Sequence, residues 1–408
     1  MRSMHAMFEN ICKEQYYRVL VSIIKEKLED FGLNLSDSKN DELIKRLTES
    51  RDAAATIKEF DFGIDSDREI SISLTKTDLE RVADACKRIH GDNLHSVILD
   101  FLEDISSMTV ESLHKEWESQ RAYEDDVLEN FKKQLFEIWG KAIEGLRMLV
   151  SLAREFGADF NRYIRKRIDN KNPFLTDVLT RLHARSCQLA DEIVCLLSSG
   201  HSDGAMARWR TLHEIAAVSL LISKHGEDLA TRYVKHEAIE AYKAARDYNE
   251  CCHRLGYPPL DSDELESLSR DRDELVDKYG KEYKNQYGWA SEVVKNSNPN
   301  LRILIEASGI GHFKAHYRLA SHNVHANPKG VYCRLGLLDN TGLLLAGPSD
   351  VGLCEPGQNA SISLLQVTAS LLSLDVTLDI LVYFKVLEKV SQEVQDLFVE
   401  IDENVEGR

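Results

Sequence analysis

The sequence lacks the features that mark zinc-binding, disulfide-linked and generally nucleic-acid-binding proteins. Its eight cysteines are scattered without CxxC spacing. This indicates neither a zinc framework nor a disulfide scaffold, and reduced thiols in a cytoplasm fit best. The net charge is −17, which argues against broad, unspecific nucleic-acid binding because such binding needs a basic surface. A local basic patch is still allowed.

Membrane-spanning character is also missing. The N-terminal residues contain no apolar core of signal-peptide length. Residues 360–384 are long enough and apolar enough to be weighed as a membrane span, but they contain Asp375 and Asp379. Each carboxylate would cost roughly 3 kcal/mol near the centre of a bilayer. We therefore predict a buried core helix there and no membrane partner.

Proline is scarce, and its seven occurrences all lie at or after position 173. Without a strong helix breaker, the first 172 residues are predicted to form long amphipathic helices. A chain of 408 residues also favours two or three domains. We expect an N-terminal helical domain over residues 1–105 and long connecting helices over residues 106–160.

The remainder is predicted to be helical with one exception. Residues 331–338 and 343–346 flank the turn-forming sequence DNTG, a pattern typical of a small β-hairpin. An apolar helix over residues 358–389 is expected to close the core, and residues 393–408 form a charged tail. The predicted fold class is thus all-α, with a helical bundle over residues 161–392 that carries a β-hairpin insertion.

Residues 311–327 contain the most informative pattern. If this stretch is helical up to Pro328, Arg318, His322 and His325 lie on one face, because positions three and four apart are stacked. An arginine beside an imidazole can bind a phosphate and move a proton. The alternative is a structural role, in which Arg318 and His325 pair with Glu214 or with backbone carbonyls.

Candidate supporting residues lie nearby and on an earlier helix. Arg210 and Glu214 are four residues apart in an apolar helix over residues 204–225, so they can pair on one face. They would form either a salt bridge that fixes the helix or one wall of a site. Ser321 and Asn323 are predicted to support the Arg318 region from its own helix.

A basic run at residues 161–171 is a candidate RNA-binding segment. Its candidate residues are Arg162, Arg165, Lys166 and Arg167. Such a cluster can hold a phosphate backbone. It can equally be a solvated helix C-terminus, where the helix dipole favours cations.

A metal site is the remaining use for the histidines. His312 and His316 have the four-residue spacing of a helical zinc pair, but no glutamate stands beside them as in zinc proteases. We therefore predict no metal and no cofactor.

Four sequence elements carry a resemblance to a known family. They are GHSDGAMARWRTLHE, RYVKHEAIEAY, YGWA and YRLASHNVH. With them, residues 172–389 resemble the bacterial family catalogued as domain of unknown function 5677. The arrangement also resembles the wider HEPN group of helical domains, many of which are metal-independent endoribonucleases of toxin–antitoxin and phage-defence systems.

The HEPN resemblance implies a catalytic arginine followed, after four to six residues, by a histidine. Arg318 and His325 have six residues between them and fit, whereas His322 follows Arg318 too closely. Leu319 stands where the group usually has a polar residue. The resemblance further implies a homodimer in which each chain contributes one Arg318–His325 pair.

We therefore expect a cytoplasmic, HEPN-like endoribonuclease that cleaves RNA with an arginine–histidine pair, as a toxin or phage-defence effector. An antitoxin or another defence protein would be its partner. The alternative is a non-catalytic helical module that binds a protein or a signal within a defence system. A metal-dependent hydrolase is a third, weaker hypothesis.

Overall fold

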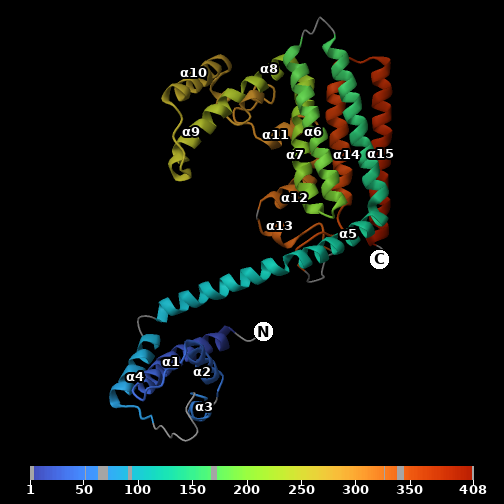
Figure 1. Ribbon diagram of the computed structural model, residues 1–408. Coiled ribbons are helices and arrows are strands. Elements are labelled where there is room, and N and C mark those ends of the chain that lie inside the picture. Colours follow the sequence, from blue (N-terminus) through green and yellow to red (C-terminus); the bar gives the residue numbers. More distant parts are fainter. Residues whose placement is uncertain are drawn as a thin grey trace. The chain divides into compact units, whose positions relative to one another are not determined.

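The computed structural model describes residues 4–50, 52–62, 72–90, 94–166, 172–325, 327–337 and 344–406. Within these ranges the protein is all-α, as predicted, and contains no strand (Figure 1). The chain divides into two compact units, residues 1–124 and residues 125–408.

The helices of unit 1 and unit 2 differ widely in length, from the five residues of α13 to the 72 of α5. The α-helices are α1 (Met4–Glu29), α2 (Asp37–Glu49), α3 (Ala53–Glu59), α4 (Lys76–His90), α5 (Leu94–Arg165), α6 (Pro173–Ser198), α7 (Ser202–His225), α8 (Glu227–Lys235), α9 (Glu237–Leu255), α10 (Ser262–Tyr279), α11 (Leu301–Ala307), α12 (Lys314–Val324), α13 (Pro328–Tyr332), α14 (Cys354–Leu372) and α15 (Leu378–Glu406). Short 3-10 helices are η1 (Lys281–Lys284), η2 (Gly288–Ala290) and η3 (Gly311–Phe313).

Unit 1 has a small core of its own. Apolar residues of α1 at helical spacing, such as Val21 and Leu28, are buried, and α2 adds Leu43 and Leu47. Ser36 is the N-cap of α2, and its hydroxyl accepts a hydrogen bond from the backbone N–H of Lys39, which satisfies one of the unpaired donors of the first turn.

Unit 2 is a helical bundle in which α6, α7, α14, α15 and the second part of α5 stand side by side (Figure 1). Two buried tryptophans tie its elements together. The Trp139 indole N–H donates to the backbone carbonyl of Asp350 at 2.8 Å, and that of Trp209 donates to the Ser363 hydroxyl at 3.0 Å. Both indoles thus keep their polar group satisfied inside an apolar core.

Close packing of α14 against α15 depends on a small residue. Gly357 of α14 lies directly under the ring of Phe398, and a Cβ added there would overlap that ring. Phe398 is fully buried and also packs against Trp139 of α5, with ring centroids 5.9 Å apart. The glycine therefore sets the distance at which α14, α15 and α5 meet.

The prediction of one apolar helix over residues 358–389 is wrong. The structure has two helices there, because residues 373–377 turn between α14 and α15. Asp375 lies in this turn and accepts a hydrogen bond from the Tyr163 hydroxyl at 2.9 Å, and the Thr377 hydroxyl accepts from the N–H of Ile380. Within the described residues, no helix is long and apolar enough to cross a membrane.

The predicted β-hairpin is also wrong where it can be compared. The residues before its turn form α13 and an irregular segment at 333–337, and residues 344–346 are not a strand. Asn327 is the N-cap of α13, and its side chain accepts a hydrogen bond from the N–H of Gly330. Pro328 is the first residue of this helix. The turn residues 339–342 lie outside the described residues. Residues 393–406, predicted as a charged tail, are the last part of α15.

Replacing Gly357 with alanine is expected to destabilise the protein by about 1–3 kcal/mol, because the added methyl overpacks the α14–α15 contact. Urea unfolding followed by circular dichroism measures this. Gly204→Ala in α7 is the matched control, since its Cβ would find its nearest neighbour at 3.5 Å. That variant should be neutral or up to about 1 kcal/mol more stable. Equal stability of the two variants would contradict the packing argument.

Candidate functional site

α12 is held on α7 by a polar network around Tyr317. The Tyr317 hydroxyl donates to Glu214 Oε1 at 2.7 Å and accepts from Arg210 Nε at 3.0 Å. Arg210 and Glu214 also form an ion pair at 3.2 Å, the pairing that their spacing predicts. Burial is the main cause that raises the pKa of Tyr317, to about 12, so the phenol stays protonated and can donate.

Apolar contacts complete this attachment. Phe313 packs near Trp209 and His213 of α7, and Ala320 is fully buried. Among the predicted supporting residues, the Ser321 hydroxyl donates to the carbonyl of Tyr317 at 2.8 Å. The Asn323 amide nitrogen is buried and has no hydrogen-bond partner within the described residues. One face of α12 is thereby fixed to the bundle and the opposite face remains outward.

The outward face of α12 forms an open pocket of about 510 Å³. Its lining contains five side chains that are or can become cationic and no carboxylate. They are His312, Lys314, Arg318, His322 and Lys329, with Ala315 and Leu319 between them. Arg318 is exposed, and within the described residues its guanidinium has neither an ion pair nor a hydrogen bond. A compensating anion would have to come from outside this part of the chain.

His322 is held in one tautomer by Asn327. The Asn327 Oδ1 accepts from the N–H of Gly330 at 3.0 Å, so its Nδ2 is the atom that lies 2.8 Å from His322 Nδ1. An amide Nδ2 only donates, and His322 Nδ1 must therefore accept. The neutral ring then carries its proton on Nε2, where it is available as a donor.

α13 approaches the end of α12 very closely. A Cβ on Gly330 would overlap the backbone carbonyl of His322, so this position requires glycine. Because Lys329 precedes Gly330, the same close approach brings its side chain to the pocket.

His325 does not share the helical face with Arg318 and His322. α12 ends at Val324, and His325 is its C-cap with extended backbone (φ −108°, ψ 136°). The expectation of a helix running to Pro328 is therefore wrong by several residues. A proline disfavours helical geometry in the residue before it, and the chain has already left the helix at His325. The imidazole is exposed and is not part of the pocket lining.

The predicted RNA-binding run lies elsewhere in the bundle. Arg162 pairs with Asp159, and Arg165 Nε donates to Asn161 at 2.9 Å; Lys166 is exposed, and Arg167 lies outside the described residues. This end of α5 is joined to the α14–α15 turn through Tyr163, whereas α12 contacts residues 209–214 in the first half of α7 (Figure 1). The run and the pocket are thus at different ends of the bundle.

The described residues contain no group of three or more histidine, cysteine or acidic side chains that could hold a metal ion. His312 is exposed at the pocket, while His316 lies 3.4 Å from the Asn359 amide of α14. The two rings are therefore directed to different surroundings despite their four-residue spacing.

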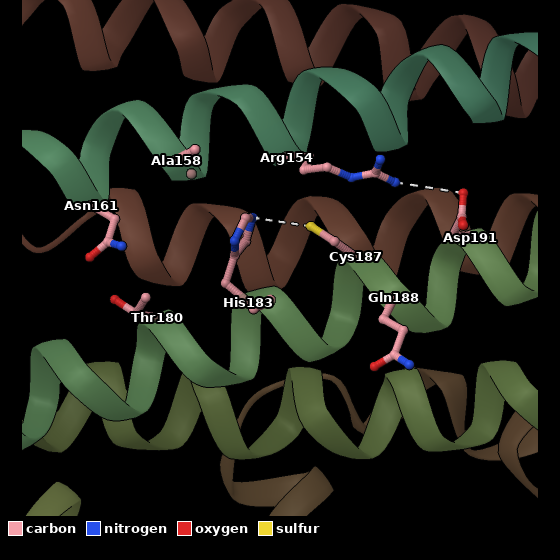
Figure 2. A pocket seen from close by; sticks show the side chains of 10 residues that line it. Arg154, Ala158, Asn161, Thr180, His183, Cys187, Gln188 and Asp191 are labelled. Atoms are coloured by element: carbon pink, nitrogen blue, oxygen red, sulfur yellow. Dashed lines mark hydrogen bonds and ion pairs between the residues drawn. The ribbon is translucent and has the colours of Figure 1, made fainter.

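A second pocket lies between α5 and α6 and contains a cysteine–histidine pair (Figure 2). Cys187 Sγ is 3.6 Å from His183 Nε2, and Gly157 leaves the space that the His183 ring fills. Burial lowers the pKa of His183 to about 4 and raises the pKa of Cys187 to about 12. A nucleophilic cysteine needs the opposite shift, so this pair serves packing.

His213 is the other buried imidazole near the site. Both ring nitrogens are buried without a hydrogen-bond partner within the described residues. Burial, followed by the neighbouring His312 and His316, lowers the pKa of His213 to about 4. The ring is therefore neutral in the folded protein and acts as an aromatic spacer between Trp209, Phe313 and Tyr317.

The structure adds residues that the sequence prediction did not include. Lys314 could have been found, because it stands four residues before Arg318 on the same helical face. Lys329 and Asn327 could not, because only the chain reversal after α12 brings Lys329 to the pocket and Asn327 to His322.

Comparison with known proteins shows that part of unit 2 is similar to one family. Residues 176–342 match the model of the family of unknown function DUF5677. The match includes α12 and α13 with the whole pocket, and it begins and ends inside the predicted span of residues 172–389. Neither the comparison with curated proteins nor that with solved structures gave a match.

Asn327→Ala is expected to cost about 1 kcal/mol of stability, because it removes the cap of α13 and the hydrogen bond to His322. Asn327→Asp is the matched control, since its carboxylate keeps the cap but can only accept. It should leave stability close to wild type and move the His322 proton to Nδ1, which long-range ¹H–¹⁵N NMR detects. The same tautomer in wild type and Asn327→Asp would contradict the assignment.

Protein stability is expected to fall as pH decreases from about 6.5 to about 4. The pKa values of His183 and His213 are lower in the folded state than their ordinary value of 6.5, so the unfolded chain binds more protons in this interval. Each histidine contributes up to about 1.4 kcal/mol per pH unit. Urea unfolding across this range gives the slope of the unfolding free energy against pH, and from it the number of protons taken up on unfolding. In His213→Leu this number should be smaller by about one than in wild type. The exposed His225→Leu should match wild type, and an unchanged His213→Leu profile would contradict the assignment.

Proposed function

We propose that this protein is a HEPN-like, metal-independent endoribonuclease that acts as a toxin or phage-defence effector. The observation that supports this best is the pocket on α12, which gathers Arg318, two imidazoles and two lysines without a carboxylate. In a chain of net charge −17, such a local cationic pocket is suited to a phosphate group. The proposed site lies within the segment that matches DUF5677.

The proposed chemistry uses Arg318 to hold the phosphate and His325, which lies outside the pocket lining, to move the protons. Arg318 would bind two non-bridging oxygens of the scissile phosphate and stabilise the charge that develops on them. The ribose 2′-oxygen would attack phosphorus while His325, the exposed imidazole beyond the helix end, accepts its proton. His322 would donate a hydrogen bond from its Nε2–H to the phosphate, and the imidazolium formed at His325 would deliver its proton to the departing 5′-oxygen. The products would be a 2′,3′-cyclic phosphate and a 5′-hydroxyl.

The supporting residues would act by orienting α12. Arg210 and Glu214 fix Tyr317 on the inner face of the helix, which sets the direction in which the adjacent Arg318 points. A homodimer would present two such pockets, one from each chain. This assembly and its cytoplasmic location belong to the same proposal.

A second candidate is a non-catalytic protein-interaction module of a defence system. α5 favours it, because its exposed part carries apolar side chains on one face at helical spacing. These include Leu102, Leu113 and Trp117, which are 50%, 60% and 52% exposed. Exposed apolar stripes of this kind are typical of surfaces that bind another protein, such as an antitoxin.

The proposed activity is tested by incubating the purified protein with mixed single-stranded RNA in a chelator. Wild type should cleave, and Arg318→Ala should reduce the rate at least about 100-fold, because the charge on the phosphate loses its main partner. His322→Ala and His325→Ala should each cost about 100-fold or more. Arg162→Ala, at the other end of the bundle, is the control and should cleave like wild type. Equal products from wild type and Arg318→Ala would exclude this site as a nuclease.

A further inference from the structure

The cations of the pocket on α12 form a row with regular spacing. Lys314, Arg318 and His322 are each four residues apart in one continuous helix, so they are stacked on one face at intervals of about 6 Å along its axis. Lys329 of α13 extends the row beyond His322. A single phosphate ion would need only one of these positions.

The row has no carboxylate partner among the residues that the structure describes. Within the described part of the chain, Lys314, Arg318 and Lys329 have no ion pair, and the pocket lining contains no aspartate or glutamate. Some other cations of unit 2 do have carboxylate partners, as Arg208 has Glu192 and Lys385 has Glu388. The row therefore presents successive positive charges to an extended anion.

We propose that the outward face of α12 binds a single strand of nucleic acid, with successive phosphates at Lys314, at Arg318 and between His322 and Lys329. A strand pulled straight presents its phosphates at regular intervals on one side, and a row of cations along one helix is complementary to it. Ala315 and Leu319 lie between the cations and contact the ribose or base. This gives Leu319 a role as an apolar floor where the HEPN pattern has a polar residue.

Two features restrict the binding to a single strand of any sequence. A duplex would place a second phosphate backbone against a protein whose net charge is −17, and the unfavourable electrostatics would weaken its binding. The pocket lining has no phenylalanine, tyrosine or tryptophan ring for base stacking and, apart from its cations and imidazoles, no polar side chain to read base edges. Affinity therefore comes from the backbone and depends steeply on salt.

The inference deepens the proposed nuclease function and rests on it for the identity of the ligand. Its test measures binding without cleavage, using fluorescein-labelled 2′-O-methyl oligouridylates of two, four and eight nucleotides, which lack the attacking hydroxyl. Affinity should rise strongly from two to four nucleotides, because the row contacts about three phosphates. From four to eight nucleotides it should rise only by the statistical factor that comes from the larger number of positions at which a longer strand can bind. A blunt duplex of the same length should compete more weakly than the single strand.

Lys314→Ala and Lys329→Ala should each weaken binding of the four-nucleotide probe about tenfold. Each should also reduce the slope of log affinity against log salt by about 0.7, the value for one phosphate of a single strand. Lys224→Ala, an exposed lysine in the last turn of α7, is the control and should bind like wild type.

The outcomes separate this inference from the nuclease proposal. If wild type binds the probe with these dependences but cleaves no RNA, the nuclease proposal fails and the strand-binding surface stands. If wild type cleaves RNA while Lys314→Ala and Lys329→Ala bind like wild type, the strand path is overturned and the nuclease stands. No binding of the probe by wild type, or equal binding of the duplex, also overturns the inference.

Discussion

The hydrogen bonds of Tyr317 are the interaction on which the candidate site depends. This hydroxyl joins α12 to Arg210 and Glu214 of α7, and it does so within a partly buried interface where a lost partner would be costly. Arg318 follows Tyr317 in the same helix, so its side chain is turned by about 100° from the bound face, and it is exposed. The exposed cationic face is thus a consequence of how the opposite face is bound.

The two pockets described for unit 2 show how burial decides chemical use. His183 and Cys187 lie together between α5 and α6, but burial keeps the imidazole neutral and the thiol protonated. The α12 pocket is open, and its arginine and lysines have no carboxylate neighbour in the lining. The His183–Cys187 pair is therefore unreactive, whereas the α12 pocket can bind an anion. Both contain residue types that are found in active sites.

The helical architecture and the Arg210–Glu214 pair could be predicted from the sequence, because both follow from local rules, namely proline placement and four-residue spacing. Features that depend on a turn could not be predicted. Pro328 was predicted to end a helix over residues 311–327, but it is the first residue of α13, with Asn327 as its cap. His325 therefore leaves the helical face, the expected hairpin segment begins as a helix, and Lys329 joins the pocket. Similarly, Asp375 marks a turn between two helices rather than a charge within one.

The central proposal is that the outward face of α12 binds a phosphodiester. A crystal structure of the protein with a 2′-O-methyl dinucleotide would show where the phosphate lies. We expect it within hydrogen-bonding distance of the Arg318 guanidinium and of His322 Nε2. A phosphate bound instead at the basic end of α5, beside Arg162 and Arg165, with the face of α12 left empty, would contradict it.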